Sequence, residues 1–196
     1  MFKGRPKDKT IALTFDDGPC KNNTEQVLNI LKMGKIVATF FLVGQEAERY
    51  PEITRKICEH GHEIGIHSFT HADFSKLSFT DIKAEIEKTR LVIKKITGKT
   101  VNIFRSPEGK IGFKLLLYSL LNRIRLVQWS ADISDSFVSS SEEVMSRFDK
   151  LPLQKGDIIL LHDDSEHTVN ALPGIISRIK DNGFAFVTIS RLSESS

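Results

Sequence analysis

Short runs of β-branched and aromatic residues alternate with segments of helical periodicity along the chain. Several runs are apolar throughout, which is typical of parallel strands covered on both faces. Repeated β-α units predict a parallel α/β sheet, either open or closed into a barrel. We expect strands at Ile11–Phe15, Thr39–Val43, Glu63–His67, Asn102–Phe104, Arg125–Trp129, Asp157–Leu161 and Phe184–Thr188.

The segments between these runs carry helix signals at their ends. Asn23 and Gln26 have the spacing of a capping box, and Gly34 indicates where that helix stops. A second helix is expected over Pro51–Gly61, because proline suits a first turn and glycine a helix end. Over Phe79–Gly98 isoleucines recur near one face, and charged side chains lie largely away from it.

The length of the chain narrows the choice of barrel. A complete eightfold barrel takes about 250 residues, whereas this chain has 196. We therefore expect a distorted (β/α) barrel of about seven parallel strands, in a single domain over residues 1–196 without a linker or internal repeat. The longest apolar run, from Ile36 to Val43, is too short to cross a bilayer. The N-terminus has basic residues but no apolar segment of a signal peptide.

Charge and cysteine content exclude several classes of function. The chain has 28 Lys and Arg against 25 Asp and Glu, a net charge of +3. This excess is too small to indicate a nucleic-acid partner, although it permits a mildly anionic substrate. Cys20 and Cys58 form no CxxC pair, so we interpret them as small apolar side chains and not as a disulfide framework.

Two groups of polar residues follow predicted strands. Asp16 and Asp17 come directly after the first strand, in the segment TFDDGP. Asp-Gly is also common in plain turns, so turn formation alone could explain this pair. His67 and His71, in HSFTH, share a face if the loop coils, and two histidines with one aspartate leave a catalytic zinc an open position. We interpret His60 and His62 nearby as surface or capping residues.

Three later segments also place polar groups after strands. Arg105 follows a strand in FRSPEG and is either a surface cation or the brace of a carboxylate. The segment WSADISD follows the next strand. His162 ends the clearest buried strand and is hard to explain by packing alone. It could form a competing metal site with Asp163, Asp164 and His167, although the two aspartates are better explained as a solvated turn.

These five segments, in this order between residues 14 and 162, resemble the motifs of the polysaccharide deacetylases, the NodB-homology group of carbohydrate esterase family four. The resemblance covers nearly the whole chain, and TFDDGP followed by HSxxH is specific to the family. It implies a distorted (β/α) barrel that binds one divalent metal ion, zinc or alternatively cobalt. It also implies hydrolysis of N-linked acetyl groups on N-acetylglucosamine-containing polysaccharides or oligosaccharides, chitin-like or peptidoglycan. Two alternatives are an O-acetyl esterase acting on glycans such as xylan and a non-catalytic carbohydrate-binding protein on the same fold.

The resemblance further implies a location outside the cell or in the cell envelope, and we expect a monomer whose partner is a carbohydrate. It assigns the metal ligands to Asp17, His67 and His71. It assigns catalytic roles to Asp16 as general base, to Arg105 as its brace, to His162 as general acid and to Asp135 as the carboxylate that orients this histidine.

The resemblance places substrate contacts at Pro107, Glu108, Trp129 and Leu160, with the backbone N–H of Glu108 as an oxyanion donor. Two positions depart from the family pattern. Glu108 stands where an aromatic residue is frequent, and Ser136 stands where a tryptophan usually lines the acetyl pocket. Either Phe137 or another apolar group takes the place of this tryptophan, or the pocket is more open. These departures bear on substrate choice more than on reaction type.

Overall fold

The protein is described by a computed structural model that covers all residues except 2, 5, 7, 195 and 196. Its strands form one curled sheet, and every pair in it is parallel. The strands are β1 (Thr10–Asp16), β2 (Thr39–Leu42), β3 (Glu63–Ile66), β4 (Ile103–Phe104), β5 (Arg125–Leu126), β6 (Ala131–Asp132), β7 (Ile158–His162) and β8 (Ala185–Phe186).

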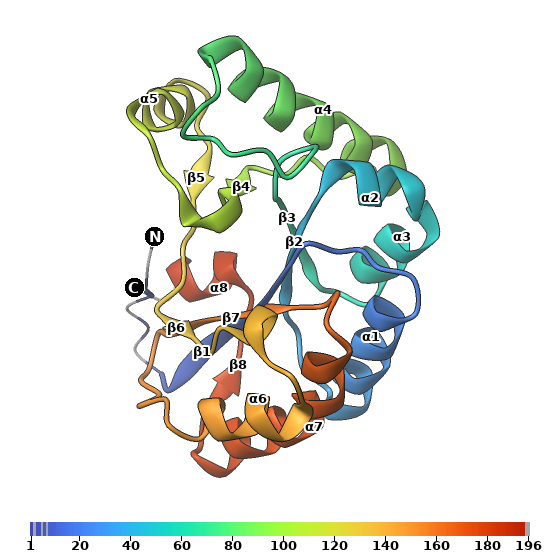
Figure 1. Cartoon of the computed structure of the whole chain (residues 1–196), viewed down its shortest axis with the longest axis vertical. Coiled ribbons are helices and arrows are strands. Elements are labelled where there is room, and N and C mark those ends of the chain that lie inside the picture. The colour runs from blue at the N-terminus through green and yellow to red at the C-terminus, as the bar shows by residue number, and fades with distance from the viewer. Residues whose placement is uncertain (2, 5, 7, 195–196) are drawn as a thin grey trace.

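The helices form an outer arc around this sheet. In Figure 1 the arc runs from α4 at the top through α2, α3 and α1 to α7 and α6 at the bottom. The helices are α1 (Asn23–Gly34), α2 (Gly44–Arg49), α3 (Pro51–Glu59), α4 (Phe79–Thr97), α5 (Phe113–Leu121), α6 (Ser141–Phe148), α7 (Glu166–Asp181) and α8 (Ile189–Glu194), with 3₁₀ turns η1 (Pro107–Gly109) and η2 (Asp135–Phe137).

The strand order is β5-β4-β3-β2-β1-β7-β6, and β8 pairs with the start of β1. The predicted distorted (β/α) barrel is therefore confirmed, and each predicted strand segment contains a strand. The sheet has one strand more than expected, because Ala131–Asp132 pairs with β7 as β6. Strands β5 and β6 are consecutive in the chain but lie at opposite ends of this order, so the sheet is open between them. The segment that joins them contacts the N-terminus, because the Gln128 N–H donates to Met1 O at 2.7 Å.

Alternation along the strands separates two cores. In β1, Ile11, Leu13 and Phe15 belong to the larger core, which also contains the buried faces of the outer helices. The residues between them face the inside of the curled sheet. There, a smaller core contains Ala12, Phe41, Ile103 and Ile158 of the strands, Val127 directly after β5, and Ile189 and Leu192 of α8. The same alternation places Thr14 and Asp16, further along β1, on the inner face.

Three helix predictions are close to the structure, with local corrections. The expected helices correspond to α1, α3 and α4, and Gly98 caps α4 in a left-handed conformation. The prediction of Asn23 as an N-cap is wrong, because it lies inside α1 and its Nδ2 donates to Asp164 O at 2.9 Å. The cap of α4 is Ser78, which forms a capping box with Asp81.

The interpretation of His62 as a surface or capping residue is also wrong. The side chain is buried, and its Nδ1 accepts a hydrogen bond from the Ala38 N–H at 3.2 Å, just before β2. Burial lowers the pKa of His62 to about 4. Cys20 and Cys58 are free and half-buried. Among the described helices, none has the length and apolar character to cross a bilayer.

Gly65 of β3 offers a test of inner-face packing. A Cβ at this position would lie 2.5 Å from Cδ1 of Phe41, so Gly65→Ala must displace that ring. Overpacking of this kind costs about 1–3 kcal/mol of unfolding free energy, measurable by urea denaturation. The matched control is Gly34→Ala at the end of α1, where the nearest atom is 3.6 Å away. We expect the control to be neutral or slightly stabilising, and equal losses in both variants would contradict this account.

Candidate active site

A buried ion pair lies at the carboxyl end of the inner face. Nη1 of Arg105 donates to Oδ1 of Asp16 at 2.7 Å and to Oγ1 of Thr14 at 2.8 Å. Arg105 directly follows β4 and has no exposed surface. Its guanidinium carbon lies 4.2 Å from the centroid of the Phe41 ring, so the apolar layer below supports it. The arrangement fixes one oxygen of Asp16 and leaves Oδ2, which lies 3.8 Å from Nε2 of His67, facing the neighbouring loops.

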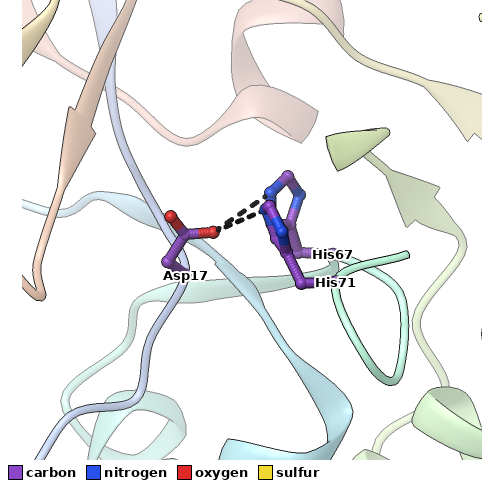
Figure 2. A group of neighbouring side chains, drawn as sticks. All are labelled: Asp17, His67 and His71. Carbon is purple, nitrogen blue, oxygen red and sulfur yellow. Dashed lines mark ion pairs between the residues drawn. The ribbon is translucent and has the colours of Figure 1, made fainter. Parts of the chain in front are cut away.

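Asp17, His67 and His71 form a compact group beside this pair (Figure 2). Their candidate ligand atoms all lie within 4.8 Å of one another. Oδ1 of Asp17 lies 3.4 Å from Nε2 of His67 and 3.2 Å from Nε2 of His71. This oxygen is buried and makes no hydrogen bond, so a cation between the three residues would satisfy it. The set of two imidazoles and one carboxylate fits a divalent ion such as zinc.

The charges of this group favour ligation. Burial acts to raise the pKa of Asp17, but the two histidines outweigh it and hold this pKa well below its usual range. The Asp17 carboxylate in turn raises the pKa of His71. Nδ1 of His67 lies 2.9 Å from the carbonyl oxygen of Arg105. A carbonyl can only accept, so Nδ1 carries the proton, and the lone pair of Nε2 faces Asp17.

Glu85 of α4 holds the loop that carries both histidines. Its Oε2 accepts from the N–H groups of Phe69 at 2.7 Å and Thr70 at 2.9 Å, and its Oε1 accepts from Oγ1 of Thr70 at 2.9 Å. Lys88 lies three residues after Glu85 in α4, and its ammonium is 3.6 Å from the centroid of the Phe69 ring. Sequence reasoning missed Glu85, because a glutamate on an amphipathic helix usually faces solvent. Its only signal is its position among the polar residues of α4.

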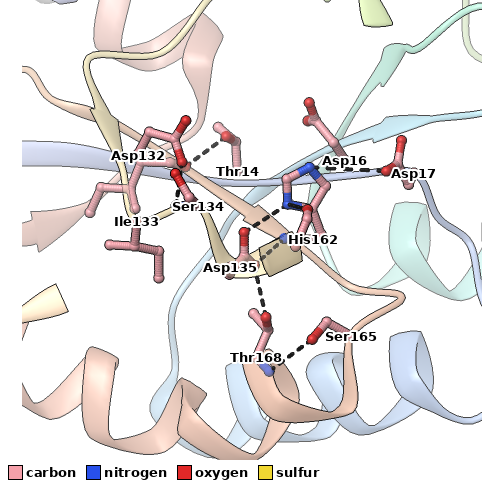
Figure 3. Close-up of polar contacts among 12 residues, drawn as sticks. Thr14, Asp16, Asp17, Asp132, Ile133, Ser134, Asp135, His162, Ser165 and Thr168 are labelled. Carbon is pink, nitrogen blue, oxygen red and sulfur yellow. Dashed lines mark hydrogen bonds and ion pairs between the residues drawn. The ribbon is translucent and has the colours of Figure 1, made fainter. Parts of the chain in front are cut away.

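A carboxylate-histidine pair, formed by Asp135 of η2 and His162 of β7, lies beside Asp17 of the metal group (Figure 3). Oδ1 of Asp135 lies 2.7 Å from Nδ1 of His162, and Oδ2 accepts from the His162 N–H at 2.8 Å. Thr168 of α7 donates its hydroxyl to the same Oδ2 at 2.8 Å. This orients Nε2 of His162 toward Asp17, whose Oδ2 is 4.0 Å away. Burial acts to lower the pKa of His162, but Asp135 prevails and raises it to about 9.

Asp163 and Asp164 form a turn as expected, and Asp164 is exposed, but the interpretation of Asp163 as solvated is wrong. Asp163 has no exposed surface, and its Oδ2 accepts from Oγ1 of Thr24 at 2.5 Å. A Cβ at Gly18 would lie 2.4 Å from the same oxygen, so Asp163 packs directly against the turn after β1. Burial raises the pKa of Asp163 to about 7. Within the described residues, a possible metal group occurs at Asp17, His67 and His71 and does not include the competing set around His162.

The four predicted substrate contacts differ in accessibility. Pro107 and Leu160 are buried, whereas Trp129 is half-buried, and a Cβ at Gly109 would lie 2.8 Å from its ring. Glu108 has a φ of 54°, and its carboxylate lies 2.8 Å from Nζ of Lys110. This ion pair directs the carboxylate toward a lysine.

The position of the missing tryptophan is open. The Ser136 hydroxyl lies 3.1 Å from Nδ1 of His162. The side chain of Phe137 is 82% exposed, so it does not pack in place of a tryptophan. Replacement of the tryptophan by Phe137 is therefore wrong, and a more open pocket stays a prediction.

The structure thus brings together at one rim the predicted residues of the metal group and of both carboxylate pairs, with ion-pair distances of 2.7–4.0 Å between them. They come from the ends of β1, β3, β4 and β7 and from η2. Their roles in catalysis stay predictions. The contacts that sequence reasoning missed are those of Glu85, Thr168 and Phe41, which hold these residues from neighbouring elements.

Comparison with known proteins gives consistent matches. The family model for polysaccharide deacetylase matches residues 3–122. A peptidoglycan-N-acetylglucosamine deacetylase of Bacillus cereus is 32% identical over 201 residues, which cover 100% of this chain and 72% of that protein. A bifunctional xylanase/deacetylase of Pseudobutyrivibrio xylanivorans is 38% identical over 190 residues, 95% of this chain but 31% of that protein.

A solved structure is similar throughout. The crystal structure of the Bc1960 peptidoglycan N-acetylglucosamine deacetylase, in complex with a hydroxamate-type benzamide, has a TM-score of 0.94 and 32% identity to this chain. The match covers 100% of this chain and 92% of that one. The fold is therefore shared over the whole length of the chain.

Metal binding is directly testable. We expect Asp17→Asn to lower zinc affinity by at least about a hundredfold, because even changes to groups that only orient ligands cost roughly 10–100-fold. Calorimetric titration and elemental analysis measure this without reference to activity. The matched control is Asp164→Asn, the same substitution at an exposed residue near His162. Loss of zinc in the control, with retention in Asp17→Asn, would instead place the metal at the competing site.

Proposed function

Because the chain belongs to the polysaccharide deacetylase family, we propose that it hydrolyses N-linked acetyl groups on the N-acetylated sugars of peptidoglycan or a chitin-like glycan. The observation that carries this proposal is the convergence of a metal-binding group, a braced carboxylate and a carboxylate-bound histidine at one rim. The peptidoglycan deacetylase of Bacillus cereus, aligned over the entire chain, supports peptidoglycan as the first substrate to test.

Asp17, His67 and His71 would hold the divalent ion. When bound there, such an ion lowers the pKa of a water molecule and polarises the acetyl carbonyl. Three protein ligands would leave a coordination position of such an ion free for water or the acetyl group.

Asp16 would accept the proton of the attacking water. Its Oδ1 is engaged by Arg105, while Oδ2 faces the metal group. The buried guanidinium fixes the position of this carboxylate, as a general base requires. Adjacent aspartates can therefore differ in role, because Asp17 has a left-handed φ of 73° and faces the two histidines, whereas Asp16 remains in the strand.

His162 would protonate the leaving amine. Asp135 accepts at Nδ1, so the proton available for transfer lies on Nε2, on the side of Asp17. A pKa of about 9 keeps the imidazole protonated at neutral pH, as a general acid requires. The Glu108 N–H would donate to the developing oxyanion, and the Glu108 carboxylate, which is paired with Lys110, would point away from it.

A second candidate, hydrolysis of O-acetyl esters on xylan, has one specific support. The bifunctional xylanase/deacetylase shares 38% identity with this chain. Esters need less assistance at the leaving group than amides, so the same residues would serve both reactions.

Acetate release tests the proposal. We expect peptidoglycan or chitooligosaccharides to release more acetate than acetylxylan, and we expect a chelator to abolish the release until zinc or cobalt is restored. Asp16→Asn should lower turnover about 10²–10⁴-fold with its zinc retained, and Asp132→Asn, at an exposed aspartate of β6, is the matched control. Undiminished release in a metal-free sample would overturn the proposal, and a preference for acetylxylan would favour the second candidate.

The pH dependence of turnover tests the role of His162. Its pKa is raised from 6.5 to about 9, so the acid form is present below this value and is lost as the pH rises through it. We expect kcat/KM for the amide to fall above about pH 9 in the unmodified protein. Asp135→Asn removes the group that raises this pKa, so the alkaline limb should move to lower pH.

Asp132→Asn again serves as control, and its alkaline limb should not move. The titration of His162, followed by NMR, gives the same pKa independently of turnover. An unchanged limb in Asp135→Asn, with a shifted NMR titration, would show that another group supplies the proton.

A further inference from the structure

Helix α5 exposes an apolar face. Its exposed large side chains are Phe113, Leu116, Leu117, Leu120 and Leu121, a spacing that places them on one side of a helix. Phe113 and Leu120 are each 78% exposed. The opposite side, with Leu115, Tyr118 and Ser119, is buried against the protein. A helix that is apolar on both sides is typical of a buried element, so this face indicates a surface that binds something apolar.

The charged residues of the chain segment that carries this face all have one sign. From Gly109 to Ala131 the chain contains Lys110, Lys114, Arg123 and Arg125 but no aspartate or glutamate. An apolar helix face flanked by lysine and arginine is the pattern of elements that lie in the interface of an anionic membrane. A symmetric dimer through α5 would instead bring copies of the same cations toward each other.

A cavity of about 740 Å³ begins where α5 ends. Arg123, two residues beyond the helix, lines it together with Arg125 and Lys99. Arg125 is held by the hydroxyls of Ser190 and Ser193 at 2.8 and 2.6 Å. The one carboxylate in the lining is Glu63, whose Oε2 already accepts from the Thr39 hydroxyl at 3.0 Å and the Ser190 N–H at 3.1 Å. The cavity therefore offers cations to an anionic group.

We propose that α5 docks on an anionic phospholipid surface, with its apolar face (Phe113, Leu116, Leu117, Leu120 and Leu121) among the acyl chains and with headgroup phosphates at Arg123, Arg125 and Lys99. The cavity lies at the starts of β3, β4 and β5, whereas the candidate active site lies at strand ends. The proposed phosphate contacts therefore lie at the other end of the strands from the active-site residues. The η1 turn of that site leads directly into α5, so the surface lies close to the rim.

Sedimentation of the full chain with phospholipid vesicles tests this. We expect binding to vesicles that contain about one third phosphatidylglycerol in phosphatidylcholine, weaker binding to phosphatidylcholine alone, and weaker binding at high salt. Phe113→Gln with Leu120→Gln should lower the partition coefficient at least about tenfold. Transfer of even one such apolar side chain from water into the acyl chains changes the partition coefficient by about this factor. The matched control is Met33→Gln with Leu91→Gln, two side chains 77% and 65% exposed outside α5.

The electrostatic part has its own variant. Lys99→Gln with Arg123→Asn should lower binding to anionic vesicles and leave the weak binding to phosphatidylcholine unchanged; asparagine suits the left-handed φ of 54° at residue 123. Light scattering of the unmodified protein and of the Phe113→Gln, Leu120→Gln variant reports self-association.

The outcomes separate clearly. Failure of the unmodified protein to bind anionic vesicles, or equal binding by the Phe113→Gln, Leu120→Gln variant, overturns the proposal. A dimer that this variant dissociates, without vesicle binding, assigns the face to a second copy and also overturns it. Acetate release from a soluble oligosaccharide should be unchanged in this variant, so docking and the proposed deacetylation fail or stand independently.

Discussion

The buried guanidinium of Arg105 is the constraint on which the rest of the site depends. A charge without exposed surface must be paired. The two Nη atoms of Arg105 donate to Asp16, Thr14 and the carbonyl of Gln128, whereas its buried Nε makes no hydrogen bond. The pairing ties β1 to β4 across the interior of the sheet. Through its own carbonyl, Arg105 also sets the tautomer of His67. Removing one partner of such a buried pair typically costs about 3–5 kcal/mol of unfolding free energy. The same ion pair therefore stabilises the fold and positions the residues of the site.

Strand alternation explains why these groups meet. On the inner face, apolar side chains occupy the middle level, where Ala12, Phe41 and Ile158 pack with α8. Further along β1 the same face carries Thr14 and Asp16, two and four residues beyond Ala12. His162 lies four residues beyond Ile158 in β7, and it pairs with Asp16 as Ile158 pairs with Ala12. The change from apolar to polar along one face is therefore the transition from core to site. Phe41 lies at this boundary, beneath the guanidinium.

Much of this could be predicted from the sequence, because apolar strands and the polar residues after them are local signals. Asp16, His67 and His162 could be identified by their positions after buried runs. The remainder depends on tertiary contacts that leave no local pattern. His62 is buried because the Ala38 N–H needs an acceptor, and Asp163 is buried because it packs on Gly18. Similarly, β6 has only two residues and is defined by its pairing with β7, which no periodicity can reveal.

The loops of the site combine strain with local support. Asp17, Ser68, His71, Glu108 and Ser134 all have positive φ values, which non-glycine residues rarely adopt. Such conformations persist only where surrounding contacts fix them. Glu85 provides three hydrogen bonds to the segment between Ser68 and His71, and Lys110 engages the side chain of Glu108. The helix and loop residues that support these turns are thus as necessary to the geometry of the metal group as the three ligands themselves. A substitution at Glu85 would act on metal affinity through the backbone of the loop, without touching a ligand.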